Sequence, residues 1–371
     1  MNDAMPSSPD EHAFRQIALQ ALIHWNLRST GISLIKVREN AVFRVDCADG
    51  RKAVLRVHRQ GYHSDDALRS ESEWLAALER DGLQVPRVIP SRHGRPFELI
   101  GATSSAIGHQ VDIIEWIDGR QLGSVEAGVS GGDAEIARKY RIVGETMARM
   151  HNQSSRWQPA KGFERHSWCE EGLAGLRPLW GRFWELDALL PSQRSLLGSA
   201  RMAIREDLLA IGKSAQVYGL IHADLVPENF LVDGDDVRVI DFDDAGFGWH
   251  LFDVATSLYF LKLEPYFDVA QAALIEGYRR HRDLGDQALA SLPMFLAARS
   301  TTYLGWVHER KGTATAIELT PMLIELACSV VEDYLAQRAR RRVEALGTPT
   351  SGAASNGPSI SSAQRPSLES T

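Results

Sequence analysis

The stretch from Leu220 to Ala255 constrains this chain most strongly, because it sets acidic side chains directly after two short apolar runs. The run Val217–Ile221 predicts a strand that delivers Asp224 onto a loop. The run Val237–Ile240 predicts a second strand, which delivers Asp241 in the same way. Two carboxylates are thus presented at strand ends, with no strong nucleophile among the side chains there.

Asp224, Asn229 and Asp241 have the residue types of a phosphoryl-transfer site. The spacing from His222 to Asn229 matches the H-x-D-x-x-x-x-N pattern of a protein-kinase catalytic loop, with Ala223 in place of its arginine. In such a site one acid orients a hydroxyl and accepts its proton, while an amide and a second acid hold magnesium on a nucleoside triphosphate. Carboxylate and amide oxygens are ligands that Mg²⁺ accepts.

The joint pattern HADL-x-P-x-N, IDFDDAGFG and DVA resembles the aminoglycoside phosphotransferase family, in particular its type II homoserine kinase and RdoA-like stress-response branch. The resemblance implies an α+β, protein-kinase-like fold with a small antiparallel-sheet lobe and a mostly helical large lobe. It implies ATP and Mg²⁺ as cofactors, Asp224 as catalytic base, and Asn229 and Asp241 as metal ligands. His222 and Asp253 are expected to brace the catalytic loop.

Acidic residues also occur in turns, where they hydrogen-bond their own backbone. Asp233-Gly234-Asp235-Asp236 is interpreted as such a hairpin turn, without a chemical role. For Asp243 and Asp244 two interpretations stay open: one of them faces the metal or a cationic substrate, or both belong to a solvated loop.

The amino-terminal half has the pattern expected of the small lobe. We predict disorder over 1–10, a small lobe over 11–114, a large lobe over 115–345 and a disordered tail over 346–371. The expected small-lobe elements are a helix over Glu11–Leu27, strands over Ile32–Val37, Ala41–Asp46 and Lys52–His58, and a helix over Ser64–Arg80.

The phosphate-binding residues depart from the protein-kinase pattern. A G-x-G-x-x-G loop is missing, and the corresponding turn is Arg38-Glu39-Asn40, where Asn40 either touches phosphate or simply makes the turn. Arg56 occupies the position of the V-A-I-K lysine; Lys52 is the fallback candidate. Glu71 lies on the apolar stripe of its helix, so we expect an ion pair with Arg56, the alternative being a lobe-edge position in water.

The apolar strand Val111–Ile117 is expected to lead into the hinge between the lobes. The resemblance implies that adenine bonds backbone groups near Glu115 and Ile117.

The large lobe supplies candidates for the acceptor pocket. Trp157, Trp168, Trp180 and Trp184, with Glu170 and Glu171, could receive an amine-bearing substrate, or could simply pack helices. Arg299, Tyr303, Trp306 and Arg310 recur at helical spacing, and some of them could face the same pocket.

Composition excludes several classes of protein. The 371 residues are 44% hydrophobic and 24% charged, an ordinary soluble composition, and the net charge of −7 argues against nucleic-acid binding through bulk charge. The three cysteines are far apart, which argues against a disulfide framework or a zinc site. No apolar run reaches membrane-spanning length, so a cytoplasmic protein without a membrane partner is expected.

The leading hypothesis is an ATP-dependent phosphotransferase acting on a hydroxyl of a small molecule: an amino alcohol, amino acid, sugar or aminoglycoside. A Ser/Thr protein kinase of the RdoA-like type is an alternative, although the chain lacks an A-P-E segment and a long activation loop. An inactive nucleotide-binding module is a further alternative. It is favoured by Arg56 and the missing glycine loop but disfavoured by retention of Asp224, Asn229 and Asp241.

Overall fold

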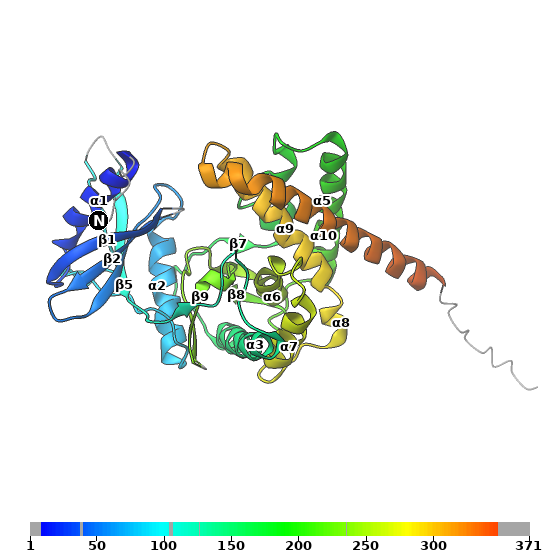
Figure 1. The fold of residues 1–371 in the computed structure, drawn as a ribbon, viewed down its shortest axis with the longest axis horizontal. Helices are drawn as coiled ribbons and strands as arrows, with labels where there is room; N and C mark the ends of the chain where they lie inside the picture. The colour runs from blue at the N-terminus through cyan, green and yellow to red at the C-terminus, as the bar shows by residue number, and fades with distance from the viewer. Residues whose placement is uncertain (1–8, 38–39, 104–106, 126, 235, 348–371) are drawn as a thin grey trace, which may run out of the picture.

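A sheet-based small lobe stands beside a larger helical lobe in the computed structural model (Figure 1), which describes residues 9–37, 40–103, 107–125, 127–234 and 236–347. The expected α+β, two-lobed architecture is confirmed. Most of the two segments expected to be disordered, 1–8 and 348–371, lies outside the described residues. The ends nearest the fold are helical instead, since the first helix begins at Pro9 and the last ends at Gly347.

The small lobe is one twisted antiparallel sheet covered by a helix. Its elements are α1 (Pro9–Leu22), β1 (Ser29–Val37), β2 (Ala41–Cys47), β3 (Lys52–Val57), α2 (Asp65–Arg80), β4 (Phe97–Ile100) and β5 (His109–Glu115). The strand order is β1-β2-β3-β5-β4. Alternate residues such as Phe43 and Leu55 are fully buried and belong to a core shared with α1, as the period of two in a strand requires. The register sets Arg56 of β3 opposite Asp112 of β5.

Helix α2 connects the two lobes. The side chain of Ser64 caps it by accepting a hydrogen bond from Ala67 N (3.0 Å). Its apolar residues Trp74, Leu75 and Leu78 belong to the large-lobe core rather than to the core under the sheet. The predicted core-facing stripe of this helix is therefore present, and it faces the large lobe.

The large lobe surrounds short strands with helices. Its elements are β6 (Arg120–Gln121), α3 (Asp133–Arg156), β7 (Ser167–Trp168), α4 (Glu170–Ala174), η1 (Phe183–Glu185), α5 (Pro191–Ile211), β8 (Tyr218–Ile221), η2 (Pro227–Asn229), β9 (Phe230–Asp233), β10 (Asp236–Val239), β11 (Gly246–Trp249), α6 (His250–Tyr259), α7 (Phe267–Arg279), α8 (Asp286–Leu289), α9 (Leu292–Glu309) and α10 (Ala314–Gly347). The strands form two three-stranded sheets, ordered β10-β9-β6 and β7-β11-β8.

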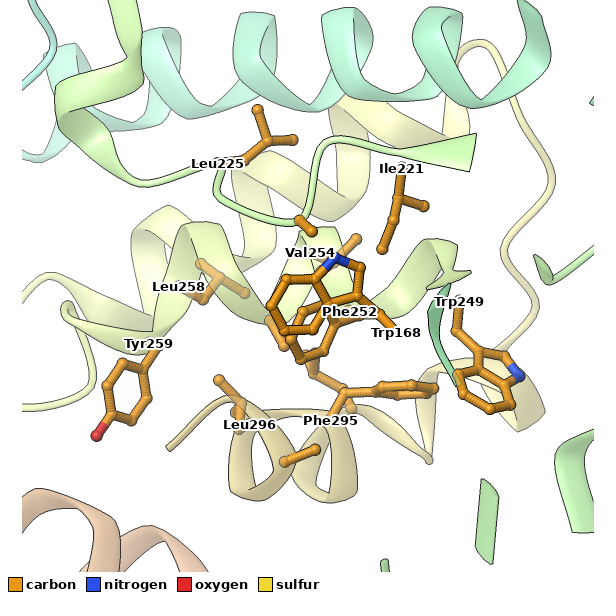
Figure 2. Close-up of a cluster of buried hydrophobic side chains, with 14 of the residues drawn as sticks. Trp168, Ile221, Leu225, Trp249, Phe252, Val254, Leu258, Tyr259, Phe295 and Leu296 are labelled. Atoms are coloured by element: carbon orange, nitrogen blue, oxygen red, sulfur yellow. The ribbon is translucent and has the colours of Figure 1, made fainter. Parts of the chain in front are cut away.

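An aromatic core lies directly beneath the loop that follows β8 (Figure 2). Trp168 and Phe252 stack with ring centroids 5.6 Å apart, and both are fully buried. Ile221, the last residue of β8, is buried in the same cluster. Close packing of this kind resists small shifts. It therefore fixes the position at which the loop leaves β8.

Within the described residues, α10 is a helix whose length and composition would allow it to cross a membrane; within Ala314–Glu344 the most apolar window of 18 residues has a mean hydropathy of 1.5. Its apolar residues Leu323, Ala327 and Val331 are buried in the large-lobe core, and the helix packs against α9 and α5. In that window 39% of the residues are buried, and a core helix of a large lobe passes the same test of length and composition.

Candidate active site

The loop after β8 is held in a strained conformation by one buried carboxylate. Ala223 has φ = +65°, a left-handed conformation that a non-glycine residue rarely adopts. Asp253, fully buried on α6, accepts hydrogen bonds from His222 N (3.0 Å, Oδ2) and Ala223 N (2.7 Å, Oδ1). Burial raises the pKa of Asp253 to about 6, against the opposing effect of His222. The expected bracing role of Asp253 agrees with these bonds.

Two buried histidines extend this brace. Nε2–H of His222 donates to the carbonyl oxygen of Ile240 (3.0 Å), which ties the Asp224 loop to the segment that carries Asp241. Nε2–H of His151 donates to Oδ2 of Asp253 (3.0 Å), and the hydroxyl of Tyr278 donates to its Nδ1 (2.9 Å). Burial lowers the pKa of both histidines, so both are neutral donors.

Both oxygens of Asp224 are held in place. Nδ2 of Asn229 donates to Oδ2 (3.0 Å) and to the Asp224 carbonyl oxygen (2.8 Å). Nη2 of Arg299, on α9, donates to Oδ1 (2.6 Å). Burial raises the pKa of Asp224, and the positive charge of Arg299 opposes that rise. The carboxylate of Asp224 therefore has one orientation at the floor of the cleft.

Asp241 also has a left-handed backbone, with φ = +68°. Its Oδ2 lies 3.1 Å from Nζ of Lys36, so a positive charge from β1 already neighbours this carboxylate. Because Asn229 uses its Nδ2 on Asp224, its Oδ1 is left as an acceptor. An amide oxygen and a carboxylate are donors that suit a hard divalent cation. Asn229 and Asp241 thus fit a metal ion.

A single cleft of about 420 Å³ brings the predicted residues together. Of the catalytic, metal-binding and nucleotide-binding residues expected from the sequence, Glu71, which pairs with Arg56, does not line this cleft, and neither does the fallback candidate Lys52. The predicted residues that line it are Asn40, Arg56, Glu115, Ile117, Asp224, Asn229 and Asp241. Residues 38 and 39 of the expected phosphate turn lie outside the described residues. Asn40 itself accepts a hydrogen bond from Arg59 N (3.2 Å).

The ion pair between Arg56 and Glu71 is present, with 2.9 Å between Nη2 and Oε1. Arg56 also bonds Asp112 through both Nε and Nη2, a pairing that sequence analysis missed. Burial acts against the charge of Arg56, but Asp112 and Glu71 outweigh it and raise its pKa. An aspartate inside the apolar run VDIIEWI was the available signal, because a buried carboxylate requires a cationic partner.

A buried charge network continues from Asp112 toward the large lobe. His58 lies 3.3 Å from Oδ2 of Asp112 and 3.6 Å from Oδ1 of Asp243, and His63 lies 3.3 Å from the same Asp243 oxygen. Burial would lower the pKa of His58, but the two carboxylates outweigh burial and raise it to about 9. Asp243 is thus neither solvated nor exposed: it lines the cleft at 4% exposure.

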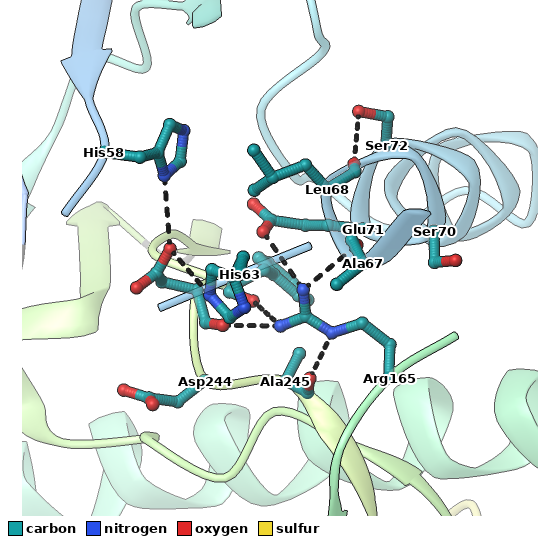
Figure 3. Close-up of polar contacts among 12 residues, drawn as sticks. His58, His63, Ala67, Leu68, Ser70, Glu71, Ser72, Arg165, Asp244 and Ala245 are labelled. Carbon is teal, nitrogen blue, oxygen red and sulfur yellow. Dashed lines mark hydrogen bonds and ion pairs between the residues drawn. The ribbon is translucent and has the colours of Figure 1, made fainter. Parts of the chain in front are cut away.

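Arg165 fastens α2 to the segment after Asp241 (Figure 3). Its Nη1 donates to the carbonyl of Ala67 in α2 (3.2 Å) and lies 3.5 Å from Oε2 of Glu71. Its Nε and Nη2 donate to the carbonyls of Ala245 and Asp243. One buried guanidinium therefore links the helix carrying Glu71 to the loop carrying Asp243.

The hinge differs in one detail from the expected adenine site. Glu115 N–H donates to the carbonyl of Arg87 (2.8 Å), and the Glu115 carboxylate bonds Arg87 Nε (2.8 Å). That backbone donor is engaged within the protein, so adenine would compete for it. Ile117, also a cleft residue, is in the stretch that joins β5 to β6.

One of the four candidate tryptophans lines the cleft. Trp180 does so, and its Nε1–H donates to Oδ1 of Asp244 (3.2 Å), which also accepts from Tyr62. The other three serve packing, as the alternative interpretation held: Trp168 in the core, Trp157 against Phe163, and Trp184 against Arg201. Glu170 and Glu171 pair instead with Lys213 and Arg205. From α9, Tyr303 and Trp306 line the cleft.

Comparisons with known proteins show the family of this chain. Residues 32–288 match the family described as "Phosphotransferase enzyme family". The amicoumacin kinase of Bacillus subtilis is 24% identical over 320 residues, covering 79% of this chain and 84% of that protein. A homoserine kinase of Beijerinckia indica is 28% identical over 246 residues, covering 63% and 68%.

Solved structures show the same fold. A microcompartment-associated aminopropanol kinase superposes with a TM-score of 0.76 and 31% identity, over 87% of this chain and 98% of that one. An amicoumacin kinase solved with AMP-PNP, Ca²⁺ and amicoumacin superposes with a TM-score of 0.69 and 21% identity, over 88% and 94%.

Fold, cleft and sequence similarity define a phosphotransferase with a protein-kinase-like fold. The chain belongs to the phosphotransferase enzyme family, as the resemblance implied. Within it, this protein is a kinase that transfers phosphate from ATP to a hydroxyl of a small molecule.

Proposed function

We propose that Asp224 is the catalytic base of this kinase and that Asn229 and Asp241 hold Mg²⁺. The observation that carries the proposal is the meeting of these three side chains in one cleft, with Asn229 bridging toward Asp224. Asp224 aims the acceptor hydroxyl at the γ-phosphorus and takes its proton. When bound, the metal ion neutralises charge on the phosphates. The larger part of the rate gain then comes from positioning and fixed charge.

We assign the phosphate contacts to Arg56, Lys36 and Asn40. Arg56 has its orientation set by Glu71 and Asp112, and its Nη1 edge carries donors that those described bonds do not use. Lys36 lies next to Asp241, where a triphosphate bound through the metal would come. Adenine would lie beside Val42, Val54 and Ile240, with backbone contacts near Ile117. On this assignment the lobes divide at 114/115, and the expected compartment is the cytoplasm, where ATP is supplied.

The acceptor side of the cleft supports an alcohol that carries an ammonium group. Asp244 and Glu228 line it together with Trp180, Tyr303 and Trp306. Carboxylates attract an ammonium, and aromatic faces add cation–π attraction. The aminopropanol kinase, by its name, acts on an amine-bearing alcohol.

The Asp224→Asn variant tests the assigned base. It preserves the shape of the side chain but cannot accept the hydroxyl proton, so kcat should fall by at least about 100-fold. Asp233→Asn, at the exposed end of β9, is the matched control and should retain wild-type kcat. A folded Asp224→Asn protein with wild-type turnover would remove Asp224 from this role.

The acceptor class is tested by comparing 1-amino-2-propanol with 1,2-propanediol, which differ in the ammonium group. We expect kcat/KM to favour the amine by about 10- to 100-fold, the value of one charge-assisted contact. Asp244→Asn should reduce this preference about tenfold while KM for ATP changes little. Equal use of amine and diol would reject the ammonium-binding proposal and leave the kinase assignment standing.

A further inference from the structure

Arg299 is a buried arginine that contacts the catalytic loop from α9. Its side chain is 0% exposed. Nη2 donates to Oδ1 of Asp224 (2.6 Å), and Nη1 donates to the carbonyl of Ala223 (3.0 Å). Nη2 also donates to the hydroxyl of Tyr303 (2.6 Å). The guanidinium therefore contacts both the proposed base and the strained residue before it.

The surroundings of Arg299 fix its guanidinium in one plane. The group lies 4.3 Å from the ring centroid of Tyr303 and 4.8 Å from that of Trp180. Burial works against the charge, while Tyr303 and Asp224 raise the pKa of Arg299, so it stays positive. A methionine or leucine would fill the same volume at lower cost if packing were the sole requirement. The cation needs Asp224 as its counter-ion, and Asp224 is held by it in turn.

The two carboxylate oxygens of Asp224 are held by different residues. Arg299 holds Oδ1 and Asn229 holds Oδ2, so the carboxylate cannot rotate about its Cβ–Cγ bond without breaking both hydrogen bonds. Each carboxylate oxygen has a second lone pair, which remains for the acceptor hydroxyl. At the same time the bond to Ala223 O supports the φ = +65° conformation that aims Asp224 into the cleft. Loss of this support would displace the base, and misplacement by about 1 Å costs on the order of 100-fold in rate.

We propose that Arg299 is a positioning residue that fixes the orientation of the Asp224 carboxylate for transfer to the acceptor hydroxyl. This proposal rests on the proposed role of Asp224 and goes beyond it, because it assigns a role to a residue outside the catalytic loop. It predicts a selective defect. The chemical step should slow, ATP should still bind, and a larger share of the γ-phosphate should go to water.

The test compares Arg299→Met and Arg299→Lys with the wild type. Methionine removes charge and donors, so kcat should fall about 100-fold; lysine retains a charge without the two-pronged geometry, so kcat should fall about tenfold. KM for ATP should stay within about threefold in both. The ratio of phosphorylated acceptor to ADP should fall below the wild-type ratio, because a misplaced base no longer selects the acceptor over water.

A matched control is Arg201→Met in α5. Arg201 also stacks on a tryptophan, 4.0 Å from the ring centroid of Trp184, and donates to the carbonyls of Ala174 and Gly175. It shares the chemistry of Arg299 without contact to Asp224, so its loss should leave kcat and the acceptor-to-ADP ratio at wild-type values. Circular dichroism and the melting temperature check that each variant is folded.

The outcomes separate this proposal from the assignment of Asp224. If Asp224→Asn is inactive while folded Arg299→Met and Arg299→Lys retain wild-type kcat and acceptor-to-ADP ratio, the positioning role is wrong and the base assignment stands. If Arg299→Met does not fold, Arg299→Lys and Tyr303→Phe decide the question. Tyr303→Phe removes one hydroxyl contact from Nη2 and should lower the acceptor-to-ADP ratio in the same direction. A wild-type ratio in both variants overturns the proposal.

Discussion

At the scale of single residues, this site is built from charges whose partners come from distant parts of the chain. Asp224 depends on Arg299, Asp241 neighbours Lys36, and Arg56 is held by Asp112. Each of these pairs joins segments far apart in sequence, so no local motif displays them. The residues of the catalytic loop could be predicted from HADL-x-P-x-N and IDFDD, whereas their partners could not.

Lys36 offers a test at this scale. The sequence does not mark Lys36 as a site residue, because a lysine is also expected at a solvent-facing position of an ordinary strand. Its Nζ is 3.1 Å from Asp241, yet its side chain is 40% exposed, so the pair contributes little to stability, about 1 kcal/mol at most. Lys36→Met should therefore raise KM for ATP about tenfold through lost phosphate contact while the melting temperature barely changes.

Lys52→Met is the control for Lys36→Met. Lys52 was the fallback phosphate candidate, but it lies 3.8 Å from Asp118 and over the ring of Trp116. Its removal should leave KM for ATP unchanged. Steady-state kinetics on both variants shows which lysine contacts the phosphates of ATP. A rise in KM for ATP confined to Lys52→Met would assign that contact to Lys52 instead of Lys36.

At the scale of elements, the connection between strand β3 and helix α2 determines how the lobes meet. His58, just after β3, lies between Asp112 and Asp243, and Tyr62 donates a hydrogen bond to Asp244. His63 contacts Asp243 as well. The sequence left Asp243 and Asp244 undecided because both a solvated loop and a buried site tolerate aspartate. Asp243 and Asp244 are buried because the small lobe supplies their partners, which are two histidines for Asp243 and a tyrosine hydroxyl for Asp244.

His58 makes this connection sensitive to pH. Its pKa is about 9 in the folded protein, above the ordinary value of 6.5. A raised pKa adds stability that is fully present below pH 6.5 and is lost as pH rises through 9. The difference corresponds to about 3 kcal/mol of unfolding free energy. We expect urea-unfolding curves of the wild type to lose about that much between pH 6.5 and pH 9.5. His58→Gln should show a flatter profile over the same interval, and two parallel profiles would contradict the charged state of His58.

At the scale of the whole molecule, the resemblance gave the architecture, and the helical and alternating patterns gave the positions of several elements. Strands β1, β2 and β3 lie where expected, and so does α2. The sequence pattern does not show which elements pack against one another, because tertiary contacts determine this. The periodicity of α2 identified an apolar stripe without saying which lobe it covers, and Trp74, Leu75 and Leu78 turned out to belong to the large-lobe core. A stripe on a helix specifies that a face is buried, and the partner is set by the rest of the chain.

This placement of α2 predicts how the protein unfolds. Trp74 is 1% exposed, its Nε1–H donates to Gln153 of α3 (3.0 Å), and its ring meets Phe242 edge-on at 5.6 Å. The small-lobe helix is thus anchored in the large lobe beside Asp241, so calorimetry of the wild type should show one cooperative transition.

Trp74→Ala removes that anchor, at a cost of about 3–5 kcal/mol. It should split the transition in two, because the sheet with α1 retains its own core while its link to the large lobe is lost. Trp25→Ala is the matched control: Trp25 is equally buried but lies within the small-lobe core, bonded to Ile89 O (2.7 Å). Loss of the Trp25 side chain weakens the small lobe but leaves α2 anchored in the large lobe. KM for ATP should therefore rise in Trp74→Ala, where α2 is released, and should rise less in Trp25→Ala. A single transition in Trp74→Ala, shifted no further than in Trp25→Ala, would mean that the lobes are coupled through the buried charges around Asp243 rather than through this helix.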